Sequence, residues 1–380
     1  MGWIAIRMLT GDRVKFIGLL FGIGFSTLLI TQQLTIFVNL LMRGGTAVEA
    51  VSSADIWVMD PASRTPDLAA AMPGTALDRV RGVSGVAWAV PLIRANAVVR
   101  TATGDLEGVG VVGVDDATLI GMPRTMLRGR PEDLADPDAV FVDGVGSDKL
   151  FGVGVNPIGI RLELNDQRAV VRGVVDVNPT FTSTVVLYTR YSNALKFVPG
   201  TRNRLTFVLA RAAPGLTPLE VTKRIAEQTG LKARTSEQFA RDGVDFIIEN
   251  TGIPINFGIT VVLGFVVGVA IVGLTFSLFI RDNIKQFGAL KAIGVTNGKI
   301  RGMVATQAGL VGLVGYAIGL SLATLFIFVS TASGGGAFKG FFIPWQIPLA
   351  TAGIVMVMIL LTGWLALRSV LKTEPAEVFR

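Results

Sequence analysis

Few residues in this chain have the types and spacing that catalysis requires. The 380 residues include no cysteine and no histidine, which excludes thiolate nucleophiles, Cys/His zinc sites and catalytic triads built on histidine. Carboxylates do gather on predicted loops, where they read more simply as solvated charge than as a cation site. These carboxylates are Asp115, Asp116, Glu132, Asp133, Asp136 and Asp138.

One segment resembles a phosphate-binding loop superficially, and it runs from Gly294 to Ile300. It is one residue too short between its glycines, and Ile300 stands where Ser or Thr must hold magnesium. No strand is predicted before it. We therefore expect no bound cofactor and no ATPase activity in this chain.

The elements around these residues are dominated by four long stretches without a charged side chain. They are Phe16–Met42, Ile255–Ile280, Gly302–Phe338 and Gly340–Leu367. A membrane-spanning helix needs about 20 mostly apolar residues, so each stretch is long enough. We predict spans at 16–42, 255–280, 302–330 and 347–367, with a short outside loop at 331–346. The first stretch is too long for a signal peptide and is expected to be retained.

Charge predicts the orientation. The segments 1–15, 281–301 and 368–380 carry 11 basic and four acidic residues, which accounts for the net charge of +7 of the whole chain. Short loops rich in Lys and Arg stay in the cytoplasm. Both termini and the 281–301 loop are therefore predicted inside, and 43–254 outside. The excess of Lys and Arg is thus explained by the orientation in the membrane, and we expect no binding of nucleic acid.

The fold class that follows is a membrane protein with four transmembrane α-helices in a 1+3 arrangement. A large extracytoplasmic α/β domain is inserted between helices 1 and 2. Within it, short predicted strands gather at 139–177, with a hairpin turn at Asn165-Asp166. Thr217-Pro218 is typical of a helix start, and residues 236–250 are predicted to form a second helix that leads into span two.

Small and polar residues inside the spans suggest how the helices pack. Three spans carry glycines one helical turn apart, which would let helices approach closely within the chain or across a dimer face. These glycines are Gly18, Gly22, Gly264, Gly268, Gly315 and Gly319. Span one also carries Gln32 and Gln33. Two amides in hydrocarbon need protein or water around them, so they are expected to form an interhelix hydrogen bond or to line a substrate cleft.

The inside loop has helical periodicity over 283–294, where Ile284, Phe287, Leu290 and Ile293 recur at period three to four. This predicts a short amphipathic helix at the membrane surface, ended by Gly294. The N-terminal segment 1–15 has a similar interfacial character. A passive loop is the alternative to a helix that contacts a partner.

The whole segment Arg281–Arg301 resembles the segment after span two in MacB/FtsX-like ABC transporter permeases. The closing residues Leu371–Val378 are similar to that family's final motif, and 139–175 resembles its extracytoplasmic β-rich subdomain. Gln286 stands where the family usually has Glu. Because no ATPase accompanies the permease segment, the chain looks most like the DevC-like subgroup.

The resemblance implies a permease of the mechanotransmission type in the bacterial inner membrane. A homodimer would bind a separate cytoplasmic ABC ATPase that holds ATP and Mg²⁺, and a periplasmic adaptor, an outer-membrane channel and membrane lipid are further implied partners. The helix that couples to the ATPase would use Ile284, Gln286, Phe287, Leu290, Lys291, Ile293 and Gly294. The alternatives are an FtsX-like regulator of an outside enzyme and a permease that extracts lipoprotein or lipid.

Overall fold

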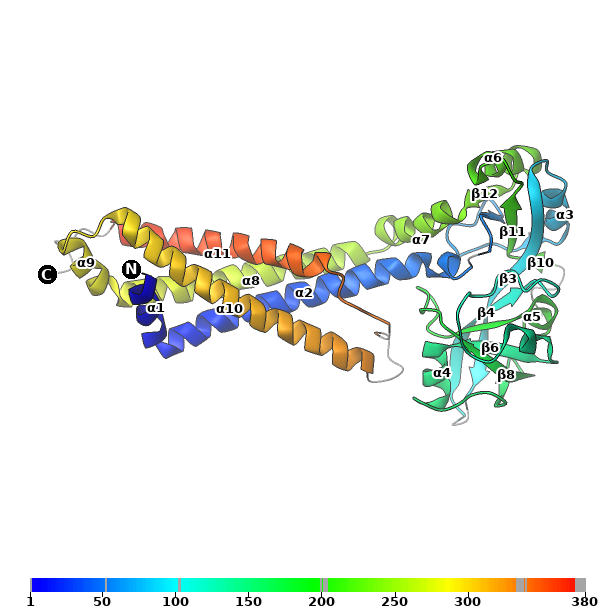
Figure 1. Cartoon of the computed structure of the whole chain (residues 1–380), viewed down its shortest axis with the longest axis horizontal. Coiled ribbons are helices and arrows are strands. Elements are labelled where there is room, and N and C mark those ends of the chain that lie inside the picture. The colour runs from blue at the N-terminus through cyan, green and yellow to red at the C-terminus, as the bar shows by residue number, and fades with distance from the viewer. Residues whose placement is uncertain are drawn as a thin grey trace. The chain divides into compact units, whose positions relative to one another are not determined.

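The computed structural model describes residues 2–51, 53–101, 104–198, 200, 204–332, 338 and 340–372, with side chains as far as Ala366. The closing motif predicted at 371–378 lies outside these residues from position 373 on. The chain divides into two compact units (Figure 1). The helical unit comprises Met1–Val38, Ile253–Val329 and Phe341–Arg380, and the α/β unit comprises Asn39–Gly252 and Ser330–Gly340.

Six of the described helices contribute to the helical unit. They are α1 (Gly2–Gly11), α2 (Arg13–Glu49), α8 (Ile253–Asp282), α9 (Ile284–Ala292), α10 (Asn297–Ala332) and α11 (Gln346–Lys372). Among the described residues, four helices are long and apolar enough to cross a membrane: α2, α8, α10 and α11 as far as Ala366. The predicted spans lie inside these helices. The helices extend further than the charge-free stretches because flanking polar residues continue the same backbone hydrogen bonds.

Helix α2 packs against α8 through the predicted glycines of both helices. A Cβ at Gly22 would lie 2.8 Å from Ile271, and one at Gly268 would lie 2.5 Å from Met358 of α11 and would also overlap Ser26. Gly18 and Gly264 make looser contacts across the same pair of helices. Lipid offers no hydrophobic drive for helix association, so this close approach supplies the dispersion contacts that hold the pair together.

The other side of α2 packs on α10 in the same way. A Cβ at Gly315 would lie 2.8 Å from Ile23, and one at Gly319 would overlap the carbonyl oxygen of Gly24. All six predicted glycines therefore face helices of their own chain. The alternative of a dimer face is not needed to explain them.

The α/β unit contains most of the remaining elements. In chain order they are β1 (Ile56–Met59), β2 (Met72–Pro73), α3 (Thr75–Arg81), β3 (Val86–Arg100), β4 (Leu106–Val114), β5 (Met126–Arg128), the 3₁₀ helix η1 (Pro131–Ala135), β6 (Ala139–Asp143), α4 (Gly144–Phe151), β7 (Arg161–Leu164), β8 (Gln167–Val175), β9 (Val186–Arg190), α5 (Tyr191–Phe197), β10 (Arg204–Leu205), β11 (Phe207–Ala212), α6 (Pro218–Thr229), β12 (Lys232–Thr235) and α7 (Ser236–Asn250).

Strand β3 joins two parts of this unit. Its first half pairs antiparallel with β11, in an open sheet of order β12-β1-β11-β3, and its second half pairs with β4 and β7. The pairings β3-β4-β9-β6-β8-β7-β3 close a ring among the described strands, around an apolar core that includes Val111, Val142 and Leu187. The predicted β-rich segment 139–177 thus supplies half of this barrel, and β3, β4 and β9 supply the rest.

The open sheet is covered on both faces, as the period-2 alternation of β1 dictates. Ile56 and Val58 lie in the core with α3 and α6, while Trp57 packs on the other face against Phe207 and Phe239 of α7, with ring centroids 5.2 and 5.6 Å away. The end of α2 reaches this second face and crosses α7 closely. A Cβ at Gly44 would lie 2.8 Å from the carbonyl oxygen of Gly243.

Local signals fix several element boundaries. Thr217 caps α6, because its hydroxyl accepts from the Glu220 N–H and the Glu220 carboxylate accepts in return from the Thr217 N–H. Asn165 and Asp166 both have positive φ, as a tight hairpin between β7 and β8 requires. The buried Asp143 caps α4 and also accepts from the Val186 N–H, and burial raises the pKa of this carboxyl to about 6.

Replacing Gly319 by leucine should disrupt the helical unit, because the added side chain meets the Gly24 backbone, which cannot move aside. Overpacking of this kind typically costs about 1–3 kcal/mol and can cost more against backbone. Gly353→Leu is the matched control, since no atom lies within 4 Å of its Cβ position. We expect size-exclusion chromatography in detergent to show a lower folded yield for Gly319→Leu alone, and equal yields would contradict the packing described.

Candidate functional site

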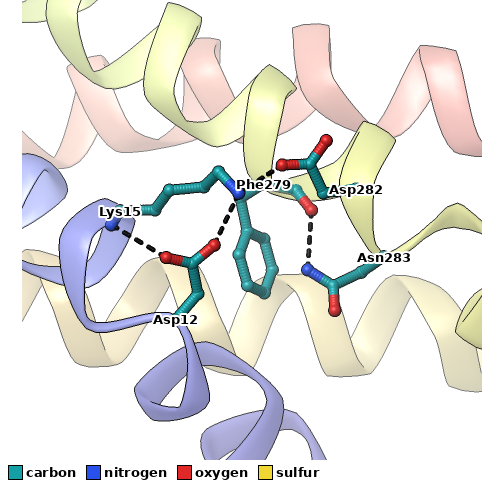
Figure 2. Close-up of polar contacts among 5 residues, drawn as sticks. All are labelled: Asp12, Lys15, Phe279, Asp282 and Asn283. Atoms are coloured by element: carbon teal, nitrogen blue, oxygen red, sulfur yellow. Dashed lines mark hydrogen bonds and ion pairs between the residues drawn. The ribbon is translucent and has the colours of Figure 1, made fainter.

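The candidate site is the end of the helical unit where α8 gives way to α9. The change of direction occurs at Asn283, whose side-chain amide donates to the carbonyl oxygen of Phe279 over 2.8 Å (Figure 2). The Asn283 carbonyl then accepts from the Phe287 N–H over 3.1 Å, which starts α9. A single residue therefore separates the two helices.

One face of α9 is buried within the chain. Phe287 is only 1% exposed and lies in one apolar cluster with Phe279 of α8 and Ile300 of α10. Ile284 and Leu290 are half-buried on the same side. The amphipathic helix is present as predicted, and the Phe287 side chain is packed inside its own unit. A contact between Phe287 and a partner stays a prediction.

The end of α9 depends on Gly294. Its φ of 89° lies in the left-handed region, its N–H donates to the Lys291 carbonyl, and the Val295 N–H donates to the Leu290 carbonyl. This pair of bonds is a Schellman motif, which favours glycine because a side chain would be strained there. Ile293 lies beyond the helix and is 80% exposed, so it is not part of the buried face. A helix, not a strand, precedes Gly294, which removes the phosphate-loop interpretation.

The remaining face of α9 is open. Lys285, Gln286 and Ala289 are exposed along this face, while Lys291 is half-buried near the helix end. Of the residues predicted to contact an ATPase, Gln286, Ile293 and Gly294 are therefore exposed at the surface. The open face combines one cation, one amide and a small apolar side chain.

An ion-paired cluster that was not predicted joins the start of α2 to the end of α8. Lys15 lies between two carboxylates, Asp12 at 2.5 Å and Asp282 at the end of α8 (Figure 2). Asp12 also caps α2 by accepting from the Lys15 N–H, and these bonds from Lys15 lower the pKa of the Asp12 carboxyl. The available signal was that segments 1–15 and 281–301 contain just these two acidic residues.

The N-terminal helix α1 is held against α10. Gln307, fully buried, donates from Nε2 to the carbonyl oxygen of Ala5 over 2.9 Å. Ala5 and Leu9 are buried on the same face of α1, whereas Trp3 is 69% exposed with the Arg7 guanidinium over its ring. This arrangement of a buried face and an exposed aromatic suits a helix at an interface.

The polar residues in the middle of α2 have different surroundings. The interhelix hydrogen bond is made by Thr31, whose hydroxyl lies 3.3 Å from that of Thr351 on α11. Gln32 and Gln33 are half-buried, and neither takes part in this bond. That the two amides form an interhelix hydrogen bond or line a substrate cleft stays a prediction.

The clustered carboxylates of the α/β unit serve local structure. Asp115 accepts from Thr118, Asp116 from Ser192, and Asp133 from the Arg130 N–H. Asp136 and Asp138 pair with arginines of β8. No group of three or more acidic side chains within the described ranges could hold a metal ion.

Comparisons with known proteins cover both units. Residues 18–228, more than half of the chain, match a family model described as the MacB-like periplasmic core domain, and residues 258–375 match the FtsX-like permease C-terminal model. A probable export ATP-binding/permease protein of Pseudomonas fluorescens strain Pf0-1 is 23% identical over 307 residues, which are 76% of this chain and 46% of that protein. The chain thus spans less than half the length of this relative.

Two solved structures are also similar. One is the extracellular domain of the noncanonic ABC-type transporter YknZ from Gram-positive bacteria, with 17% identity, a TM-score of 0.36, and coverage of 48% of this chain and 98% of that one. The other is the periplasmic region of MacB from Actinobacillus actinomycetemcomitans, with 16% identity, a TM-score of 0.37, and coverage of 54% and 96%. Because both family models match in chain order and one spans more than half of the sequence, this chain belongs to the MacB/FtsX-like family of ABC transporter permeases.

Proposed function

We propose that this permease couples ATP hydrolysis on a separate cytoplasmic subunit to movement of its α/β unit, and that this movement drives export of a periplasmic or membrane-derived substrate. The observation that carries the proposal is the two-sided character of α9. One side is packed into the bundle through Phe287, and the other side is open for a partner. ATP and Mg²⁺ would be held by the partner.

The connections of α9 suit a lever. Asn283 alone separates it from α8, and four residues separate it from α10. Phe287 shares its apolar cluster with both of these helices. A push on the open face would therefore be passed to α8 and α10, because a well-packed core transmits displacement with little compression.

The chain also offers continuous paths toward the α/β unit. Helix α2 has 37 residues, about 55 Å of helix, and it contributes residues to both units without a break. Only Thr251 and Gly252 separate α7 from α8. These links support a proposal in which the two units move as coupled bodies.

The proposed topology places both termini and the α9 segment in the cytoplasm and residues 43–254 outside the inner membrane. The surplus of basic residues at 1–15, 281–301 and 368–380 supports this orientation. A homodimer, a periplasmic adaptor and an outer-membrane channel complete the proposed assembly. The printed name of the Pseudomonas relative, which joins ATP-binding and permease functions, supports an ATPase partner.

The second candidate function is regulation in the manner of FtsX. It is supported by the match of residues 258–375, which run from α8 through α11, with the FtsX-like permease model. The same lever would then activate an outside enzyme and move no cargo. Extraction of lipid or lipoprotein is a third variant of the export role. Reconstitution of the chain with its ATPase, followed by identification of what co-purifies, distinguishes cargo from an enzyme partner.

Topology can be tested by thiol labelling, because the native sequence contains no cysteine. Cysteine at Ala62 or Lys196, both exposed, should react with a membrane-impermeant maleimide in cells whose outer envelope has been permeabilised. Cysteine at Lys285 or Lys299, also exposed, should react only after the inner membrane is lysed. Labelling of Lys285→Cys in cells with an intact inner membrane would overturn the orientation.

Coupling can be tested on the open face of α9. Ala289→Arg adds a bulky side chain where we expect the ATPase to dock, so co-purification of the ATPase and substrate-stimulated hydrolysis should fall about tenfold or more. Such a loss corresponds to about 1.4 kcal/mol of docking energy. Gly11→Arg is the control, because it adds the same side chain at an exposed position of α1 with no atom within 4 Å.

Phe287→Ala separates docking from folding. Loss of a buried phenylalanine side chain typically costs about 3–5 kcal/mol, so this variant should lower the thermal stability of the helical unit itself. Ala289→Arg should leave that stability unchanged. Full ATPase retention by Ala289→Arg would remove the open face of α9 as the docking surface and leave the passive-loop interpretation.

A further inference from the structure

A long apolar groove of about 650 Å³ runs between α10 and α11 of the helical unit. Small residues of α10 form its floor, because Ala305 and Gly309 leave space that larger side chains would fill. Exposed bulky residues stand along its sides: Leu313, Met356, Leu360 and Trp364. A groove of this size lies within the range of about 300–1,000 Å³ found for ligand sites.

Among the lining residues that the structure describes, a charged side chain stands at one end of the groove. It belongs to Arg301, which is exposed and lies four residues after the start of α10. Of the ion pairs formed by the described residues, none involves Arg301. Toward the other end, the Tyr316 hydroxyl is already used, since it donates to the carbonyl oxygen of Pro348 over 2.9 Å. A fitting ligand therefore has an anionic head and a long apolar tail.

The length of the groove agrees with such a ligand. Arg301 and Tyr316 are 15 residues apart on one helix, which is about 22 Å along its axis. One leaflet contributes about half of the roughly 30 Å hydrocarbon core, or about 15 Å. An acyl chain that starts at the depth of Arg301 would therefore reach the middle of the bilayer while still inside the groove.

We propose that this groove binds an anionic phospholipid, with the phosphate on Arg301 and one acyl chain along α10. Basic pockets between transmembrane helices commonly hold anionic headgroups, because the cation is then neutralised at the membrane surface. A second copy of the chain is the less suitable occupant. The floor at Gly309 is open, but the bulky exposed side chains along the groove would hold another helix away from it, whereas an acyl chain fits between them. The site is independent of the export role and requires only that α10 and α11 lie in lipid.

The test uses the full chain, reconstituted in equimolar phosphatidylglycerol and phosphatidylcholine and then examined by native mass spectrometry. We expect retained phosphatidylglycerol to exceed phosphatidylcholine by about fivefold, which is the equivalent of about 1 kcal/mol for one cation at an anionic surface. Arg301→Gln should return the ratio to that of the mixture, and Arg301→Lys should preserve most of the preference. Lys285→Gln removes an exposed charge elsewhere and should have no effect.

The apolar part is tested by filling the groove. Gly309→Leu should displace the retained lipid, whereas Gly353→Leu, equally unobstructed but outside the lining, should not. If Gly309→Leu does not fold, Ala305→Leu enters the groove one turn away and serves instead. Lipid retention that survives both the charge and the filling variants would overturn the proposal. A change from dimer to monomer on filling, with lipid retention unaltered, would also overturn it and would identify the groove as a contact between copies.

Discussion

Close backbone contact at glycines is the constraint on which the helical unit depends. Helix α2 lies against α8 at Gly22 and Gly268 and against α10 at Gly315 and Gly319, and most of these positions leave no room for a Cβ. Lipid tails are as apolar as the helix side chains, so burying these side chains between helices yields no hydrophobic free energy. The pairing therefore depends on dispersion contacts, which weaken steeply with distance. The arrangement of α2 in turn sets where its first residues, with Asp12 and Lys15, meet the end of α8.

The close packing of α2 with α8 also positions the candidate site. Asp282 and Asn283 lie where α8 ends. Asp282 forms an ion pair with Lys15, and the Asn283 amide donates to the Phe279 carbonyl. The buried Phe287 side chain then holds α9 against α8 and α10. Exposed surface ion pairs contribute little to stability, commonly about 0–1 kcal/mol, so Lys15 is better understood as setting geometry than as supplying much energy. The packed phenylalanine is the stronger restraint.

Local sequence rules predicted a large part of this fold. The capping box at Thr217, the turn at Asn165-Asp166 and the end of α9 at Gly294 were readable because each depends on residues within five positions of one another. The glycines of the spans were readable for a related reason, since a small residue permits contact whatever the partner is. Features set by distant residues were not readable. The direction of Phe287, the pairing of Lys15 with Asp282, and the hydrogen bond between Thr31 and Thr351 all depend on which helices are neighbours.

In the α/β unit, periodicity located the strands but not their closure into a barrel. The segment Val86–Arg100 is a single strand that takes part in both the open sheet and the barrel, and Pro91 lies within it without ending it. The ring through β7 joins segments about 60 residues apart, and alternation along a single strand contains no information on such a partner.

The crossing of α2 and α7 has a mechanical consequence. At Gly44 and Gly243 the two backbones touch, and a side chain on either residue would push them apart. The contact extends beyond this point, because the Gly44 position also meets Ile247 and the Gly45 position meets Ala240. Val48 and Phe239 share one apolar cluster beside the crossing. The crossing is therefore a close-packed seam about two helical turns long, and contacts spread along a seam set the angle between two helix axes as well as their separation.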